Sequence, residues 1–519
     1  MQRRMTPKYK QLQFDTAIRN PERYKNIISS LIDFNNKTLD DNCLLSIMCV
    51  MYRNGIVTSN EIEITDNLSD TELKDMIITV NSSRRADGGF PTGYQARFWT
   101  YMRTLSELGF VYAQYNEQLR ISKIAEALAN NKVDDQEAFS VQSLIYNRKS
   151  PYKNVSNNFN YFKFILQVLL KLNECNIKLK YTDFIVSMYN HDGNVGAYLE
   201  EITSNNITRD NILDYLNEVY DENNKPQTVL RDYPDVVLRI LRIMGYITIS
   251  SHGGELYISI NKNNIDYIKD LLKLEISCSE EEKISALSYY NRSDTYFNKF
   301  ISFINTHRKQ DTINEKVYKS KLDDIVTVFE IDENKIINLI NLLITNSREY
   351  PIVEFKYIPD PLKLEFYITI LLYIKFKEDM FIKPNYKIDD IGIPISHAPG
   401  NIGDIEVFGK SIYWLIEVTL IRSKVQQYNN ETTSVIRHIN QAITDENTDK
   451  YLSFIAPIVH IDTERFYKVA LTLSRAEGNV IYLKPYNINQ FIESINDDIF
   501  EDMKEYTNST IRSIKNISL

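Results

Sequence analysis

Cysteine, glycine and proline are all scarce in this sequence of 519 residues, which contains four cysteines, 15 glycines and 14 prolines. The cysteines are too few and too widely spaced for a disulfide framework or a CxxC zinc pattern. We therefore expect reduced thiols and a cytoplasmic protein. With 43% hydrophobic and 25% charged residues, the composition is typical of globular domains.

Long apolar runs and an excess of positive charge are also missing. No stretch of about 18 uncharged apolar residues is present, so the sequence predicts no transmembrane helix and no membrane partner. The basic start, residues 1–10, lacks the apolar core of a secretory signal. The net charge of −9 argues at first against a nucleic-acid partner.

Positive charge is nevertheless concentrated in two regions. Residues 1–25 contain seven Lys and Arg against two acids, and residues 138–173 contain five Lys and Arg and no acid. An acidic protein with such basic stripes can bind a polyanion on one face. The alternative is that these charges are ordinary solvated surface.

Two segments, 98–122 and 236–260, share one pattern. Each predicts an amphipathic helix, a glycine at the C-cap (Gly109 and Gly245) and then two strands joined by a polar turn. Expected helices precede both segments, over residues 41–54, 69–80, 181–189 and 211–220. Helix, glycine and hairpin is the pattern of a winged helix, whose helix ahead of the hairpin commonly enters the DNA major groove. A generic α+β unit is the alternative.

Basic residues near the first of these segments are candidate contacts to double-stranded DNA. The loop 81–97 is rich in glycine and arginine, which suits phosphate or base-edge contact, and the basic loop 147–155 is a candidate backbone clamp. The predicted contacts are Arg19, Arg23, Lys25, Arg84, Arg85, Arg97, Arg103, Arg148, Lys149 and Lys153. Solvated loops are the alternative.

From about residue 311 onward, helices and strands alternate. Expected helices cover 326–346, 361–377, 425–445 and 462–475, expected strands cover 451–459 and 479–484, and a last helix follows. Strands interleaved with helices indicate an α/β domain.

Two carboxylates mark a predicted β-hairpin within residues 399–424. Asp404 lies beside a short apolar segment, a Gly-Lys turn follows at 409–410, and Glu417 interrupts the apolar run 412–420. Acids thirteen residues apart on neighbouring strands can converge. An acid inside a buried strand is costly unless a proton or a cation neutralises it. The pattern therefore predicts a metal-dependent site that cleaves phosphodiesters.

Three further side chains are candidates for the same site. Glu365 lies on the apolar face of the preceding helix, and Glu431 and His438 share one face of the following helix because seven residues make two turns. Mg²⁺ takes oxygen ligands and keeps several waters, so Asp404, Glu417 and Glu365 would suffice as ligands. A histidine in this position could carry a proton.

Structural alternatives remain for these residues. Asp404 could simply end a strand, Glu417 could be a buried acid paired with Lys or Arg, and Glu365 could equally have no role in the site. A lone histidine on a polar helix, such as His438, is usually surface, and His397 could be no more than a loop residue.

Asp and Glu on a hairpin form the PD-(D/E)xK nuclease arrangement, but Thr419 occupies the position of the usual lysine and Lys424 lies too far along the chain to replace it. Residues 399–404 and 416–420 together resemble the AlwI family of type IIS restriction endonucleases, which includes strand-specific nicking enzymes.

This resemblance implies that Asp404 and Glu417 are metal ligands and that Thr419 stands in the place of the lysine. It also suggests Glu365, Glu431 and His438 as supporting residues of the site, and an N-terminal recognition region shared in outline with FokI-like enzymes.

The sequence thus predicts a multidomain α+β and α/β protein. We expect winged-helix-like DNA-recognition units over 1–170 and 171–265, a helical connector over 266–310, and a PD-(D/E)xK-like nuclease domain with a mixed central sheet over 311–519. The expected enzyme reads a short asymmetric site in duplex DNA and cuts at a fixed distance with Mg²⁺. A second subunit or a transient dimer would be needed to cut both strands. The alternatives are a non-catalytic winged-helix DNA-binding protein, such as a replication initiator or regulator, and a structure-specific nuclease.

Overall fold

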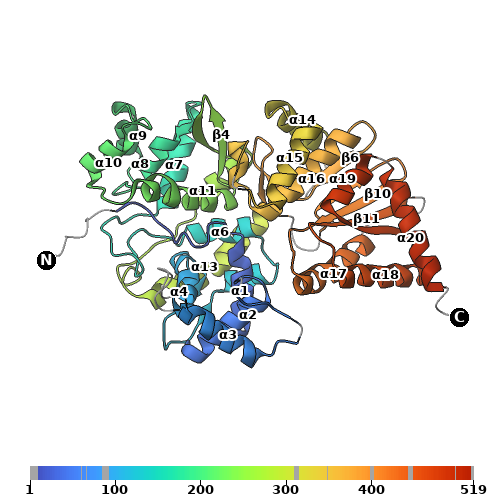
Figure 1. Ribbon diagram of the computed structural model, residues 1–519. Coiled ribbons are helices and arrows are strands. Elements are labelled where there is room, and N and C mark those ends of the chain that lie inside the picture. Colours follow the sequence, from blue (N-terminus) through green and yellow to red (C-terminus); the bar gives the residue numbers. More distant parts are fainter. Residues whose placement is uncertain are drawn as a thin grey trace. The chain divides into compact units, whose positions relative to one another are not determined.

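A computed structural model describes most of the chain, namely residues 10–59, 61–65, 67–83, 93–308, 315–347, 349–397, 402–441, 448–496 and 498–515. The chain divides into two compact units, residues 1–310 (unit 1) and 311–519 (unit 2), and mixes helices with β-sheets (Figure 1). Within the described residues, every helix is too short or too polar to cross a membrane.

Unit 1 consists mainly of helices. These are α1 (Arg23–Leu31), α2 (Asp41–Arg53), α3 (Asp70–Ser83), α4 (Gly93–Glu107), α5 (Lys123–Ala129), α6 (Asp135–Ser143), α7 (Tyr161–Glu174), α8 (Tyr181–Ser187), α9 (Val195–Ser204), α10 (Ile212–Tyr220), α11 (Tyr233–Ile243), α12 (Ile265–Leu272) and α13 (Ala286–His307). Its strands are β1 (Val111–Tyr112), β2 (Arg120–Ile121), β3 (Leu179–Lys180), β4 (Ile247–His252) and β5 (Glu255–Ile260). The helices expected from the sequence around residues 41–54, 69–80, 181–189 and 211–220 are confirmed as α2, α3, α8 and α10.

Both repeated segments contain the predicted helix, glycine and strand pair. Helix α4 leads through Gly109 to antiparallel β1 and β2, and α11 leads through Gly245 to the β4–β5 hairpin, to which β3 adds a third strand. The two glycines have φ of +74° and +70°, a left-handed conformation that favours glycine and ends each helix. The strands differ in length, because β1 and β2 have two residues each and β4 and β5 have six.

Helix α13 is packed into unit 1. The Tyr289 hydroxyl donates to the carbonyl of Glu107 at 3.0 Å, and Arg292 Nη1 donates to the carbonyl of Ile145 at 2.8 Å. Both side chains are buried. This helix lies within the segment expected as a connector, so a large part of that segment belongs to the core of unit 1 through these bonds.

Unit 2 contains α14 (Glu315–Val328), α15 (Glu333–Ile344), α16 (Asp360–Phe376), α17 (Lys424–Gln441), α18 (Ile461–Ala476), α19 (Ile488–Asn496) and α20 (Ile499–Lys515). Its strands are β6 (Phe381–Pro384), β7 (Lys387–Ile388), β8 (Pro394–Ser396), β9 (Ile405–Phe408), β10 (Ile412–Val418), β11 (Asp449–Ala456) and β12 (Ile481–Asn487). The predicted hairpin is therefore confirmed as β9 and β10, which pair antiparallel.

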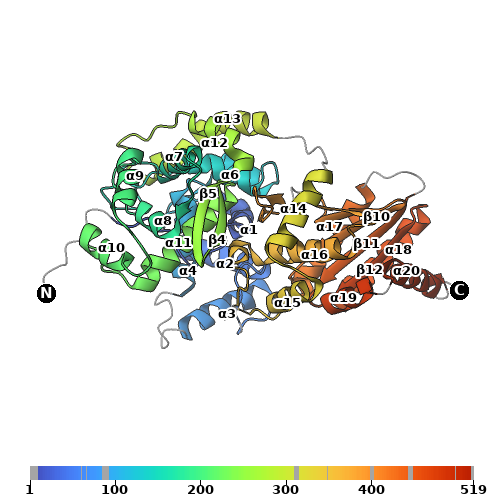
Figure 2. The same cartoon turned by 90° about the horizontal axis from the view of Figure 1, so that it is seen from above.

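A five-stranded mixed sheet in the order β12-β11-β10-β9-β6 forms the centre of unit 2. Strands β10, β11 and β12 are parallel, and β9 is antiparallel to both β10 and β6. Strands β10 and β11 run side by side in both views (Figures 1 and 2). Helices α16 and α19 cover one face of the sheet, and α17 and α18 cover the other (Figure 1).

The alternation of side chains along β9 and β10 determines which face the acids occupy. Tyr413 and Leu415 pack with α17 and α18, whereas Trp414 and Ile416 pack with α16 and α19. Because side chains alternate with a period of two, Glu417 points toward α17. Asp404, one residue before β9, has the same parity as Phe408, which packs on the α17 side.

Candidate active site

Asp404 and Glu417 lie at the same end of the β9–β10 pair. Ile405 is paired with Ile416, which places the two acids next to each other just beyond this pair. The backbone N–H of Val418 donates to Asp404 Oδ2 at 2.8 Å, which holds the Asp404 carboxyl at the hairpin. Glu417 is only 6% exposed. The convergence expected from the sequence is therefore present in the structure.

Helix α17 brings Glu431 and His438 to the hairpin. His438 Nδ1 lies 2.7 Å from Glu417 Oε1, and the Thr419 hydroxyl donates to Glu431 Oε1 at 3.3 Å. The His438 side chain is 11% exposed, so the alternative that it is a surface residue is wrong.

Glu365 on α16 is buried. Its Oε1 lies 2.7 Å from Nδ1 of His397, which follows β8. From the sequence alone His397 could be no more than a loop residue, because its contact with an acid 32 positions earlier leaves no local signal. Only the packing of α16 near the end of β8 brings the two together.

Burial and the charges of neighbouring acids raise the pKa of Asp404, Glu417 and Glu431. Burial first, and then the charges of Glu365 and Glu417, hold the pKa of Asp404 well above its usual value. Burial, followed by the charges of Glu431 and Glu365, does the same to the pKa of Glu417. Burial also raises the pKa of Glu431 and lowers the pKa of His438. The cluster therefore favours bound protons or a bound cation.

Lysines near the hairpin pair with other acids. Lys383 Nζ lies 2.7 Å from Glu406 Oε2, and Lys424 Nζ lies 2.6 Å from Asp462 Oδ2. Burial opposes the charge of Glu406, but Lys383, Asn385 and Tyr413 together lower its pKa. Among the ion pairs of the described residues, the partner of Glu417 is His438 and not Lys or Arg.

The residues present fit a divalent cation in part. Within the described residues, no group of three or more His, Cys, Asp or Glu side chains already forms a ready-made metal site. Two buried atoms at the cluster, Glu365 Oε2 and His438 Nε2, have no hydrogen-bond partner in the described structure. An orphaned carboxylate oxygen beside acids of raised pKa is what a cation with oxygen ligands would satisfy.

Gly403 packs closely against the side chains of Leu415 and Glu417. A Cβ at this position would lie 2.4 Å from Leu415 Cδ1 and 2.8 Å from Glu417 Oε1. Asn385 holds the segment in place, since its side chain donates to the Gly403 carbonyl at 2.8 Å and its backbone N–H donates to the Asp404 carbonyl at 3.0 Å.

If this cluster cleaves phosphodiesters, we expect Gly403→Ala to lower the cleavage rate by about a hundredfold, because a displaced Glu417 carboxyl would lose its alignment with Asp404. Gly409→Ala, in the turn of the same hairpin, is the matched control, since a Cβ there would meet its nearest atom at 3.4 Å. Cleavage rates of the two variants, with their melting temperatures, test this. Equal rates would show that Gly403 does not control the site.

The candidate DNA contacts in unit 1 differ in their exposure. Arg23 and Arg103 are exposed, Lys25, Arg97 and Lys149 are partly exposed, and Arg84 and Arg85 lie outside the described residues. Arg19 is exposed and pairs with Asp232 at 2.9 Å.

Arg148 and Lys153 are bonded inside unit 1. Arg148 is 2% exposed and donates to the carbonyls of Met188, at 2.7 Å, and Lys10. Lys153 Nζ lies 3.1 Å from the buried Glu107 Oε1 and donates to the Gln13 carbonyl at 3.0 Å. The sequence could not show this, because a basic loop has the same composition whether its side chains point outward or inward.

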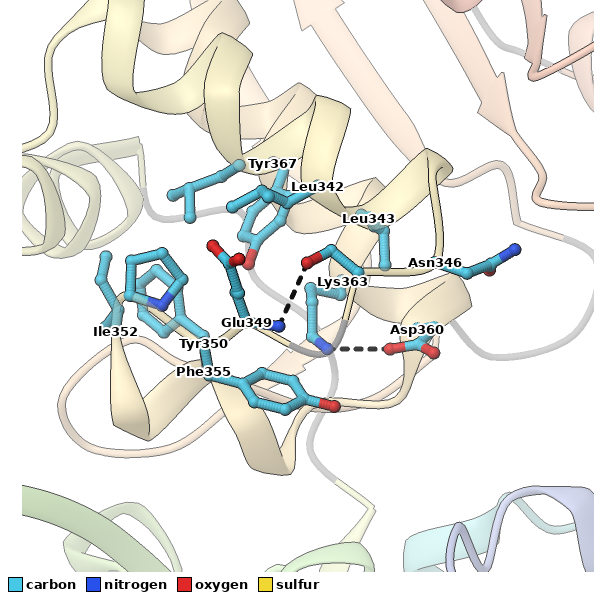
Figure 3. Close-up of a pocket in the computed structure, with 13 residues that line it drawn as sticks. Leu342, Leu343, Asn346, Glu349, Tyr350, Ile352, Phe355, Asp360, Lys363 and Tyr367 are labelled. Carbon is cyan, nitrogen blue, oxygen red and sulfur yellow. Dashed lines mark hydrogen bonds and ion pairs between the residues drawn. The ribbon is translucent and has the colours of Figure 1, made fainter.

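A separate cavity of about 150 Å³ lies in unit 2 between α15 and the start of α16 (Figure 3). Its walls include Leu342, Tyr350 and Phe355, and Lys363 pairs with Asp360 at 2.8 Å. No member of the acidic cluster lines it, so this cavity is distinct from the candidate active site.

A cluster of acids at the end of a mixed sheet is a suitable site for metal-assisted hydrolysis. The chain belongs to the AlwI restriction endonuclease family, whose family model matches residues 106–360 and 291–494. The protein is therefore a nuclease of the restriction endonuclease class. No curated protein matches the chain.

Three solved structures are similar to the chain over different shares of its length. The small subunit of the heterodimeric restriction endonuclease R.BspD6I is 21% identical, with 34% of this chain and 89% of that chain covered and a TM-score of 0.26. The BpuJ1 endonuclease binding domain, in complex with modified DNA, is 14% identical, with 56% and 96% covered and a TM-score of 0.32. Restriction endonuclease FokI is 12% identical, with 96% and 97% covered and a TM-score of 0.24.

Proposed function

We propose that this protein is a type IIS-like, site-specific DNA endonuclease that reads duplex DNA with unit 1 and hydrolyses it with unit 2, using Mg²⁺. The observation that carries the proposal is the cluster of acids Glu365, Asp404, Glu417 and Glu431 in a member of the AlwI family. Glu365 and Glu417 are buried, and Asp404 and Glu431 are partly exposed.

Asp404, Glu417 and Glu365 are the residues that would hold the cation. When bound, Mg²⁺ supplies a Lewis acid for the scissile phosphate and a water of lowered pKa. His438 orients Glu417 through its 2.7 Å contact, and His397 orients Glu365 in the same way. Such contacts from the two histidines hold the Glu417 and Glu365 carboxylates in a fixed orientation toward the cation.

Thr419 replaces the usual lysine with a hydroxyl that cannot accept a proton from water near neutral pH. Glu431 lies 3.3 Å from that hydroxyl, and burial raises the pKa of its carboxyl. A carboxylate of raised pKa is a better general base than an ordinary one. We therefore assign to Glu431 the acceptance of the proton from the attacking water.

In unit 1, we propose winged-helix-like recognition units within residues 1–170 and 171–265, built on α4 with β1–β2 and on α11 with β4–β5. The exposed and partly exposed basic residues Arg19, Arg23, Lys25, Arg97, Arg103 and Lys149, with Arg84 and Arg85, are the proposed contacts to DNA. Arg148 and Lys153 are left out, because their bonds within unit 1 commit them to the fold.

The proposal is tested by incubating the full chain with supercoiled plasmid and Mg²⁺ and sequencing both strands by run-off. We expect breaks at one fixed offset from a shared short sequence, and none with Asp404→Asn. Breaks in one strand only would identify a nicking enzyme. Breaks located at branches or ends of the DNA, independent of its sequence, would instead support a structure-specific nuclease. DNA binding without cleavage in Mg²⁺ or Mn²⁺ would overturn the proposed activity of this chain alone.

A further inference from the structure

The cavity between α15 and the start of α16 has the size and the walls of a binding site for one aromatic ring. It measures about 150 Å³, and Tyr350, Phe355 and Tyr367 are among the residues that line it (Figure 3). A cavity of roughly 150 Å³ with apolar walls admits a single six-membered ring such as benzene. Aromatic walls add offset-stacked or edge-to-face contacts to such a ring. These features favour a planar ligand of one ring.

An ion pair lies in the wall of the same cavity. Lys363 is 4% exposed, and its Nζ lies 2.8 Å from Asp360 Oδ1 and 5.3 Å from the centre of the Tyr350 ring. The Asp360 side chain is 60% exposed. The pair therefore presents a buried hydrogen-bond donor beside an accessible acceptor. A ligand without polar groups would use neither of them.

A pyrimidine base matches both features of the cavity. It is a single six-membered ring, and its Watson–Crick edge carries a hydrogen-bond donor next to an acceptor. Asp360 can accept from that donor while Lys363 donates to that acceptor. Tyr350, which is 43% exposed, can stack on the face of the ring. A purine has two fused rings and needs more room.

Helix α16 connects this cavity to the acidic cluster. Lys363 and Glu365 are two residues apart on α16, a rise of about 3 Å along the helix axis. Residues two apart point to different sides of a helix, which is about 10–12 Å across with its side chains. Successive nucleotides of one DNA strand are about 3.4 Å apart. A strand held at the acids would therefore have a nucleotide within reach of the cavity.

We propose that this cavity receives a pyrimidine base extruded from duplex DNA, a few nucleotides from the bond that the acidic cluster cleaves. Lys363 and Asp360 bind the edge of the base, and Tyr350 packs on its face. Extrusion costs the energy of unstacking and unpairing, which these contacts offset in part. DNA as the source of the base rests on the proposed function, whereas binding of a free pyrimidine nucleoside does not.

Free deoxycytidine and thymidine test the cavity without any DNA cleavage. Ligand-observed NMR titrations of the full chain should give a Kd of about 1 mM or tighter for at least one of them. Lys363→Met and Tyr350→Ala should each weaken this binding at least about tenfold, because each removes a contact to the ring. Lys375→Met is the matched control on the same helix, since Lys375 pairs with Glu333 at 2.7 Å and is not among the residues that line the cavity.

Binding of neither nucleoside, or equal binding by the wild type and both cavity variants, would overturn the inference. Deoxyadenosine bound as tightly as the pyrimidine nucleosides would overturn the assignment to a single ring. Melting temperatures show which variants fold, and Tyr350→Ala changes an exposed side chain, so it tests the cavity even where Lys363→Met does not fold.

Mismatched duplexes then test DNA as the source of the base. A mismatched base costs less to extrude, so a single pyrimidine mismatch at the extruded position should tighten binding about tenfold. We would move the mismatch one nucleotide at a time around the cut and measure binding to Asp404→Asn, in which cleavage is expected to be lost. Tightening at one position, removed when Tyr350→Ala is added, supports the inference. Tightening at no position would overturn the DNA source.

Plasmid cleavage measured beside nucleoside binding separates the two proposals. Cleavage without nucleoside binding rejects the cavity as a base site and leaves the proposed function intact. Nucleoside binding without cleavage rejects the proposed function and leaves the cavity as a site for a free pyrimidine nucleoside.

Discussion

Glu417→Gln is expected to lower plasmid cleavage by about a thousandfold or more, the scale of losing one group that stabilises a transition state electrostatically. The same change should raise the melting temperature of the metal-free protein. Glu417 is 6% exposed and its pKa is raised by burial and by the charges of Glu431 and Glu365. The amide of glutamine keeps an oxygen that can accept a hydrogen bond from His438. It also removes a buried negative charge, which no Lys or Arg neutralises among the ion pairs of the described residues.

Glu406→Gln is the matched control on the same hairpin. Glu406 lies 2.7 Å from Lys383 and also accepts from Tyr413 at 2.9 Å. Its replacement should lower the melting temperature, because an ion pair is lost, and leave cleavage nearly unchanged. Calorimetry without metal and plasmid assays with Mg²⁺ measure the two effects. Equal loss of cleavage in both variants would show that the hairpin needs its charges only for folding.

The second large effect is a dependence of stability on pH that a cation reverses. In the folded protein the pKa of Asp404, Glu417 and Glu431 is raised. In the unfolded chain these carboxyl groups have a pKa of about 4, so at pH values above about 4 the folded state binds more protons than the unfolded state. Stability contributed by these groups is therefore greatest in acid and declines as pH rises through their folded pKa. Added Mg²⁺ should restore stability most at high pH, because it binds the deprotonated carboxylates.

Comparison with Asp404→Asn isolates this contribution. In unit 1, burial raises the pKa of Glu107 to about 7. Glu107 therefore also makes the stability of the protein decline as pH rises. We would measure the difference in melting temperature between the wild type and Asp404→Asn from pH 5 to pH 8 in chelator. The contribution of Glu107 is the same in both proteins, so it cancels in this difference. We expect the variant to gain relative stability as pH rises and to respond less to Mg²⁺. A difference independent of pH would contradict a raised pKa of Asp404.

The sequence by itself determined the local parts of this protein. The alternation of apolar residues placed Asp404 and Glu417 on one hairpin, and the seven-residue spacing placed Glu431 and His438 on one face of a helix. Such features depend on periods of two and 3.6 residues within one segment, so they can be read without knowledge of the partner segment.

Only the tertiary structure decided which segments meet. The contact of His397 with Glu365 and the burial of Arg148 each depend on residues far away in the chain. The strand order β12-β11-β10-β9-β6 and the side of the sheet taken by each helix set the first of these contacts, and the packing of unit 1 sets the second. No single strand or helix carries that order, because it results from the packing of all of them around a common core.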